Sequence, residues 1–119
     1  IPTYKEKDNI FKLTKKIFKL IPKCSIYIVD DTPQLSLKGS FKDSRIKYFH
    51  RKNNKGRGSA VLFGFRKSLK NKLNKIFIEM DADFSHDPRE LKRNIKYFLN
   101  LLICCYISEW KLLSSFYSI

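Results

Sequence analysis

The sequence KIFIEMDADFSHDP, residues 75–88, decides the fold that we expect for this chain. It begins with a nearly continuous hydrophobic run over residues 76–80, which predicts a strand covered on both faces, as in parallel sheets flanked by helices. The polar residues begin where this strand should end. Asp87 and Pro88 then predict the start of a helix, with Asp as the cap and Pro in the first turn.

Two carboxylates, Asp81 and Asp83, follow the predicted strand directly. Ligands of open α/β sheets bind just beyond the carboxyl ends of the strands, so this pair lies where a site is expected. Alternate residues of an extended segment point the same way, which would let both carboxylates face one Mg2+ or Mn2+ ion. The alternative is that the pair caps a helix or lies in a turn, because Asp-x-Asp alone has little specificity.

Composition favours a single domain at most, without a nucleic-acid partner. The chain has 119 residues, of which 43% are hydrophobic, enough to support a core. The net charge is +14, but six of the 25 basic residues are Arg, and the lysines are spread along the chain. No recognised nucleic-acid motif accompanies them, so we expect a solvated basic surface. The chain begins at Ile1 without a visible signal peptide, which favours a fragment.

Strands and helices alternate along the chain. Residues 1–6 are typical of a strand end entering a loop, and residues 25–29 and 45–50 predict two further strands. A helix with Asp8 or Asn9 as its cap is expected to end before Pro22. The buried stripe of that helix is formed by Ile10, Leu13, Ile17 and Leu20. This order implies βαβ units, and therefore an α/β fold with a mostly parallel sheet.

A basic, glycine-containing loop over residues 51–60 leads into a helix that carries Ala60 to Leu69. The loop has neither a dinucleotide fingerprint nor a Walker A motif. Backbone N–H groups at the helix start, with Lys52, Lys55 and Arg57 close by, would suit an anionic group. A tight turn with solvated charges is the equally supported alternative. After Pro88, a last helix is expected to bury Leu91, Ile95, Phe98, Leu99 and Leu102.

Four segments, in this order, resemble one family. They are Ile1-Pro2-Thr3-Tyr4-Lys5-Glu6, Val29-Asp30-Asp31, Gly56-Arg57-Gly58-Ser59-Ala60 and Met80-Asp81-Ala82-Asp83-Phe84-Ser85-His86-Asp87-Pro88. Together they resemble the family-2 glycosyltransferases, most closely the catalytic subunits of the dolichyl-phosphate mannosyltransferase branch, as a fragment. The resemblance covers residues 1–98, a sugar-nucleotide-binding part. Residues 99–119 form an apolar tail that does not match the family and is too interrupted by polar residues for a membrane span.

The resemblance implies a GT-A, Rossmann-like fold, incomplete at both ends, that transfers mannose from GDP-mannose to dolichyl phosphate with Mg2+ or Mn2+. It also implies a place at the cytosolic face of the endoplasmic reticulum membrane and small membrane-anchoring subunits as partners. Residue by residue, it assigns Pro2, Tyr4 and Glu6 to the guanosine, and Val29 and Asp31 to base and ribose. It assigns Asp81, Ala82 and Asp83 to ribose and diphosphate, with Asp81 and Asp83 as metal ligands and Asp83 as the catalytic residue.

The sequence also departs from this family. Lys5 stands where Asn is usual, the turn after Asp31 is shortened, and the first strand is missing apart from Ile1. These departures leave two alternatives: an inactive remnant that binds anions or a partner, and a related polyprenyl-phosphate glucosyltransferase.

Overall fold

A computed structural model of the chain describes residues 1–33, 37–53 and 56–100. It divides into two units, Ile1–Pro88 and Arg89–Ile119. All strands within the described residues lie in the first unit.

The first unit is built on a parallel sheet in the order β1-β2-β3. Its strands are β1 (Pro2–Thr3), β2 (Ile26–Asp30) and β3 (Ile46–His50). The last two begin one residue later than predicted, and β2 also ends one residue later. The residues that directly follow the three strands lie at one edge of the sheet, because the strands are parallel and in register.

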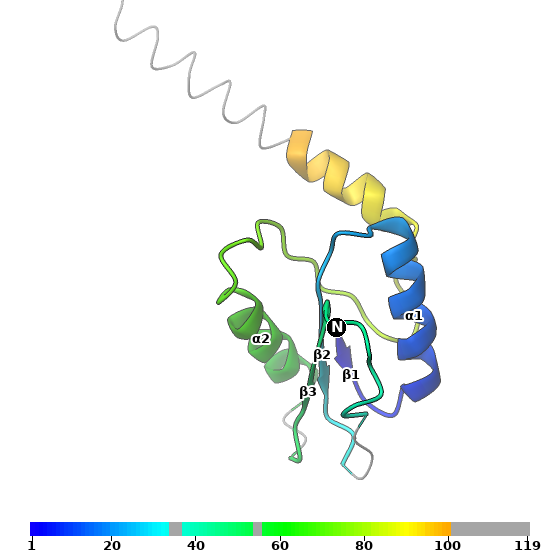
Figure 1. Ribbon diagram of the computed structural model, residues 1–119, viewed down its shortest axis with the longest axis vertical. Helices are drawn as coiled ribbons and strands as arrows, with labels where there is room; N and C mark the ends of the chain where they lie inside the picture. The colour runs from blue at the N-terminus through cyan, green and yellow to red at the C-terminus, as the bar shows by residue number, and fades with distance from the viewer. Residues whose placement is uncertain (34–36, 54–55, 101–119) are drawn as a thin grey trace, which may run out of the picture. The chain divides into compact units, whose positions relative to one another are not determined.

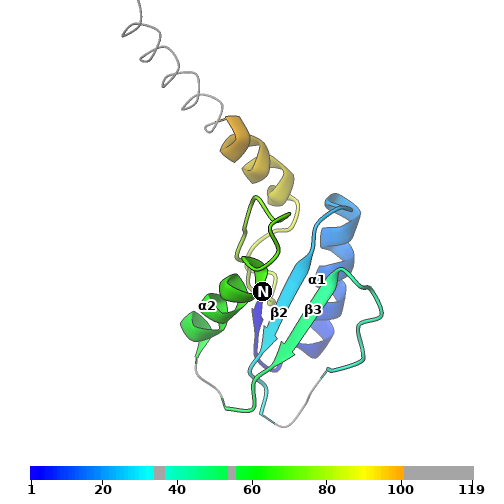
Figure 2. The ribbon, with the colours of Figure 1, turned by 60° about the vertical axis from the view of Figure 1, so that its left-hand side comes forward.

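Two helices flank this sheet, α1 (Lys7–Leu20) on one face and α2 (Arg57–Ser68) on the other (Figures 1 and 2). The predicted α/β class, a parallel sheet with flanking helices, is therefore confirmed. The cap predicted for α1 is wrong: Glu6 occupies the cap position, and the side chain of Asn9 donates to the Glu6 carboxylate instead of capping the helix.

The core lies on both faces of β2. Ile28 and Val29 are 0% and 1% exposed, and they point to opposite faces because neighbouring strand residues alternate. The predicted stripe of α1 is largely confirmed, since Ile10, Leu13 and Ile17 are buried. On the other face, a Cβ added to Gly64 of α2 would lie 3.4 Å from Val29 Cγ2, so helix and strand approach closely there.

The strand predicted over residues 76–80 is not formed, and this prediction is wrong. These residues are described without strand pairing. The end of this segment lies near β1, since Asp81 and Ala82 line the same cleft as Pro2 and Thr3. β1 offers few backbone hydrogen-bonding groups to a further strand, because it has two residues and Pro2 has no N–H.

The second unit is a helix in its described part, over residues 90–100. The helix predicted after Pro88 is thus present, with an ion pair between Arg93 and Glu90 on its surface. Burial of Phe98 and Leu99 was predicted wrongly: they are 46% and 43% exposed, because no other described element of this unit packs on them. Leu102 and the tail after residue 100 lie outside the described residues. None of the helices in the described ranges is long and apolar enough to cross a membrane.

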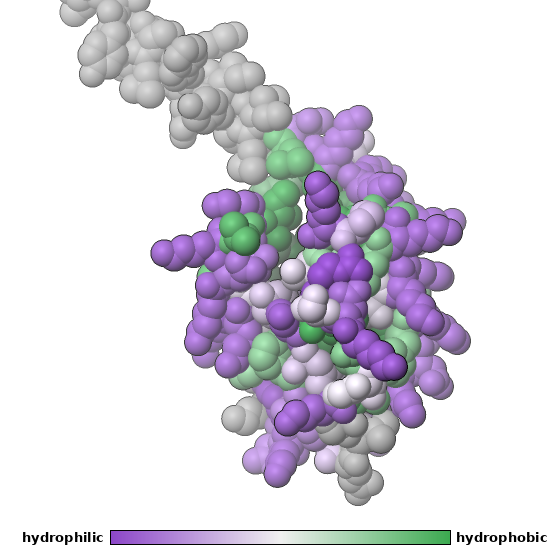
Figure 3. All heavy atoms as spheres, in the orientation of Figure 1, coloured by the Kyte–Doolittle hydropathy of each residue, from purple (hydrophilic) through white to green (hydrophobic). Residues whose placement is uncertain are grey.

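Hydrophilic side chains predominate over α1 and α2 on the face shown in Figure 3. Lys12, Lys15, Lys16 and Lys19 of α1 are all exposed, opposite its buried stripe. The lysines of α1 therefore lie on a solvated surface, as the sequence predicts.

Truncation of Ile28 should cost much more stability than truncation of an exposed leucine. We expect Ile28→Ala to lower the free energy of unfolding by about 2–5 kcal/mol, because it leaves a cavity between β2 and its neighbours. Leu73, which is 84% exposed, is the control, and Leu73→Ala should stay within about 0.5 kcal/mol of the parent. Urea unfolding measures both; equal losses would contradict the placement of the core.

Candidate functional site

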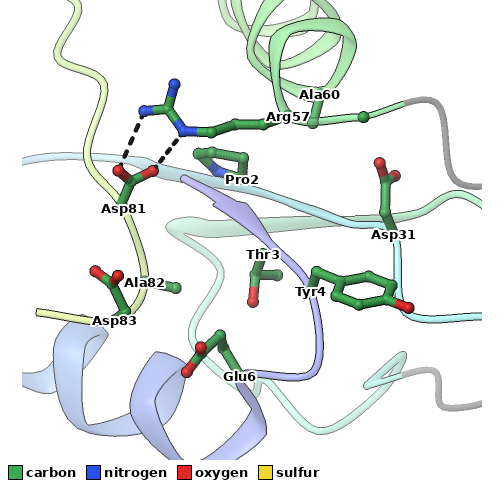
Figure 4. Close-up of a pocket in the computed structure, with 11 residues that line it drawn as sticks. Pro2, Thr3, Tyr4, Glu6, Asp31, Arg57, Ala60, Asp81, Ala82 and Asp83 are labelled. Atoms are coloured by element: carbon green, nitrogen blue, oxygen red, sulfur yellow. Dashed lines mark hydrogen bonds and ion pairs between the residues drawn. The ribbon is translucent and has the colours of Figure 1, made fainter. Parts of the chain in front are cut away.

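An open cleft of about 420 Å³ lies at the carboxyl edge of the sheet (Figure 4). Its walls come from β1 and the segment after it, the residue after β2, the start of α2 with its cap residue, and the segment at residues 81–83. The lining residues are Pro2, Thr3, Tyr4, Glu6, Asp31, Gly56, Arg57, Ala60, Asp81, Ala82 and Asp83. The cleft has the position that ligand sites take in open α/β sheets.

Seven of the eight residues assigned from the sequence line this cleft. They are Pro2, Tyr4, Glu6, Asp31, Asp81, Ala82 and Asp83. Val29 is not among the lining residues; it is 1% exposed and packs toward Gly64 of α2. Thus the structure brings together segments from both ends of the first unit, while the binding roles of the individual residues stay predictions.

Asp31 is held by an arginine that the sequence reasoning missed as a site residue. Arg51 follows β3 as Asp31 follows β2, and its Nε and Nη2 each lie 2.5 Å from a carboxylate oxygen of Asp31. The two side chains are 10% and 5% exposed. Arg51 also donates to Ser59 Oγ of α2 at 2.9 Å. The pair therefore ties two strand ends to the helix and fixes the orientation of Asp31.

A second polar network holds the loop after β2. The buried carboxylate of Asp30 accepts hydrogen bonds from Thr32 N at 2.9 Å and Tyr48 Oη at 2.6 Å. Tyr48 Oη in turn accepts from Leu37 N, and Thr32 Oγ1 accepts from Lys5 N at 2.7 Å. Because Asp30 has these partners, it serves the structure of the loop, whereas its neighbour Asp31 faces the cleft.

Asp81 is engaged by the first residue of α2. Arg57 Nε lies 2.8 Å from Asp81 Oδ1, and Arg57 Nη2 lies 3.2 Å from Oδ2, as the dashed lines of Figure 4 show. The same Nη2 lies 2.5 Å from Glu79 Oε1. These contacts, the hydrogen bond to Asp81 first, raise the pKa of Arg57 above its already high value. The sequence indicated Arg57 as a cation near an anionic ligand, but not as a partner of Asp81.

Asp83 and His86 organise the turn that follows. Asp83 Oδ1 accepts from Ser85 N at 2.9 Å, and hydrogen bonding from Ser85 holds the pKa of Asp83 below its usual value. His86 Nδ1 accepts from Asp81 N at 3.2 Å, as expected of a turn residue. Phe84, next to Asp83, has a φ of 65°, in the left-handed region, and Lys5, between the cleft residues Tyr4 and Glu6, has a φ of 59°.

The carboxylates do not share one face of a strand, because residues 82–83 form a turn. No group of three or more His, Cys, Asp or Glu side chains suited to a metal occurs among the residues that the structure describes. Two carboxylates on one cleft are nevertheless the donors that Mg2+ uses when substrate phosphates complete its coordination. The residues present therefore fit a divalent cation bound together with a diphosphate, provided that Arg57 moves away from Asp81.

The glycine loop forms the entrance to α2. Gly56 has φ 81° and ψ 163°, a combination that is essentially restricted to glycine. It thereby turns the chain so that Gly56, Arg57 and Ala60 reach the cleft. Lys52 is exposed and Lys55 lies outside the described residues, so of the three cations considered, Arg57 is the one that lines the cleft.

Substitution of two neighbouring glycines should have opposite effects. Gly56→Ala is expected to cost about 1–3 kcal/mol of stability, because alanine is strained at this φ and ψ. Gly58→Ala, the matched control inside α2, has open space for its Cβ and should stabilise by up to about 1 kcal/mol. Thermal unfolding distinguishes them; loss of stability in both would show that the loop has another conformation.

Removal of Arg51 should destabilise the fold through Asp31. We expect Arg51→Met to cost about 3–5 kcal/mol, because a buried carboxylate then loses its counter-charge. Adding Asp31→Asn to this variant should restore part of the loss. Chemical denaturation of the single and double variants gives the coupling; a loss below about 1 kcal/mol for Arg51→Met, typical of surface pairs, would argue against a buried pair.

Residues 1–107 match the family described as Glycosyl transferase family 2. Over 99 residues, 78% of this chain, the chain is 35% identical to a polyprenol monophosphomannose synthase of Mycolicibacterium smegmatis and 31% identical to an undecaprenyl-phosphate mannosyltransferase of Micrococcus luteus. It is 30% identical over 106 residues, 84% of this chain, to a dolichol-phosphate mannosyltransferase of Pyrococcus furiosus. No solved structure matches significantly.

The chain spans 37%, 40% and 29% of the lengths of these three relatives, in the same order. The family match extends beyond residue 98. The proposed domain limit at that residue stays a prediction.

Proposed function

Because the chain belongs to glycosyl transferase family 2, we propose that it forms the donor-binding part of an enzyme that transfers mannose from GDP-mannose to dolichyl phosphate. The observation that carries this proposal is the cleft, on which seven of the eight assigned residues meet. The names of the three relatives all refer to mannose and to a polyprenol or dolichol phosphate, which favours mannose as the sugar.

In this proposal each wall of the cleft contacts a different part of the sugar nucleotide. Pro2, Tyr4 and Glu6 contact the guanosine, with Asp31 toward the ribose. Asp81, Ala82 and Asp83 face the diphosphate on the opposite side. The fixed orientation of Asp31 favours this role, because a carboxylate held by Arg51 can still accept a ribose hydroxyl through its remaining lone pairs.

The proposed mannosyl transfer does not need a strong general base. The acceptor is a phosphate that is already ionised at neutral pH, so its oxygen can attack the anomeric carbon in line and invert it. The departing nucleoside diphosphate is the difficult part. A Mg2+ or Mn2+ ion held by Asp81 and Asp83 would neutralise charge that develops there. Asp83, which Ser85 keeps ionised to lower pH, is suited to this task.

The acceptor is a lipid, which places the reaction at a membrane surface. We propose the cytosolic face of the endoplasmic reticulum, with small membrane subunits that hold the catalytic chain there. The resemblance in sequence is what supports this location.

Donor binding should depend on the metal and on Asp83. In isothermal titration calorimetry, GDP-mannose is expected to bind the chain with Mn2+ and to lose most of its affinity with EDTA. Asp83→Asn should weaken binding roughly tenfold or more, the size of one lost charge-assisted contact. Asp43→Asn is the control, because Asp43 lies outside the cleft and pairs with Arg45.

Other outcomes of the titration have distinct meanings. Tighter binding of UDP-glucose would favour a glucosyltransferase. Binding of GDP-mannose without mannosyl transfer to dolichyl phosphate in vesicles would identify a donor-binding module without turnover. Equal heats with and without Asp83 would contradict the assigned site.

A further inference from the structure

Arg57 and Asp81 form a pair whose two members would bind different ligands: Asp81 a cation and Arg57 an anion. Its guanidinium spans Asp81 and Glu79, and both oxygens of Asp81 are within 3.2 Å of its nitrogens. A divalent cation at Asp81 would meet this positive charge at the same oxygens. Like charges at such a distance repel, so a cation at these oxygens and the guanidinium weaken each other's binding to the carboxylate.

The same side chain is placed to receive an anion. Arg57 lines the cleft at the start of α2, beside Gly56 and Ala60. Guanidinium groups bind phosphate oxygens in a two-pronged geometry, and a helix start adds partial positive charge. The Arg57 side chain is 57% exposed, and its partners Glu79 and Asp81 are 30% and 28% exposed. Pairs this accessible to water are weak, so exchange to another partner is feasible.

We propose that Arg57 is a donor-binding residue that rests on Asp81 and Glu79 when the cleft holds no donor and transfers to the diphosphate when the donor binds. This inference rests on the proposed function, because it takes the ligand to be a nucleoside diphosphate with a divalent cation. Its transfer exposes Asp81 to the cation. Metal and nucleotide therefore bind with positive coupling, and the metal alone binds weakly.

The test removes the guanidinium and follows both ligands separately. Mn2+ binding is measured from the electron paramagnetic resonance signal of the free ion, and GDP binding by calorimetry at saturating Mn2+. In Arg57→Leu, Mn2+ alone should bind about 3- to 10-fold more tightly, because a nearby positive charge is gone. GDP should bind about 5-fold or more weakly, because the diphosphate has lost a charged donor.

Two further variants separate this mechanism from a general effect of charge. Arg66→Leu removes the same charge from the exposed face of α2, outside the cleft, and should change neither affinity by more than about twofold, since salt screens exposed charges. Arg57→Lys keeps the charge without the two-pronged geometry, and both of its affinities should lie between those of the parent and Arg57→Leu.

Opposite shifts of the two affinities in Arg57→Leu, absent in Arg66→Leu, support the proposal. Unchanged or weaker Mn2+ binding in Arg57→Leu overturns it, even if GDP still binds and the proposed function stands. No Mn2+ binding to either protein also overturns it. Tighter Mn2+ binding without any GDP binding would retain the competition between Arg57 and the cation but overturn the transfer to a diphosphate, together with the proposed donor.

Discussion

Ladder hydrogen bonds join β2 to β1 along one edge and to β3 along the other, and side chains cover both of its faces. Each buried polar group needs a hydrogen-bonding partner. Near the end of a central strand, the adjoining segments can supply such partners. The apolar run of β2 accordingly ends in Asp30, and Asp31 follows. Asp30 is bound by the loop that it organises, and Asp31 by Arg51. The strand that forms the core thus also places Asp31 at the cleft.

Much of this arrangement follows from the sequence, because it depends on local periodicity. The stripe of Ile10, Leu13 and Ile17 predicts α1, and the alternation of apolar runs with helices predicts parallel strands. This reasoning fails for the hydrophobic run at residues 76–80, which does not form the predicted strand. Hydrophobicity reports that a segment prefers burial, but a ladder also needs a partner with free N–H and C=O groups, which the two residues of β1 do not supply.

The two arginines that pair with the acids of the cleft could not be placed from their spacing in the sequence. Arg51 lies 20 residues from Asp31, and Arg57 lies 24 residues from Asp81, and a long flexible side chain can reach several partners across such a sheet edge. Their surroundings give them different characters. The side chains of the Arg51–Asp31 pair are largely buried, whereas those of the Arg57–Asp81 pair are open to water, so the second pair can exchange more readily. Arg51 therefore has a structural role beside the cleft, whereas Arg57 can bind a ligand that enters it.

The left-handed backbone at Lys5 and Phe84 limits how the walls of the cleft can change. Asn, Asp and Gly adopt this conformation at little cost, whereas β-branched residues do so with difficulty. Lys5 retains it with the help of the hydrogen bond from its N–H to Thr32, and the ring of Phe84 lies 4.7 Å from Lys16 Nζ. Substitution of either residue by a β-branched residue should therefore strain the backbone, whereas Asn, Asp or Gly would keep its conformation.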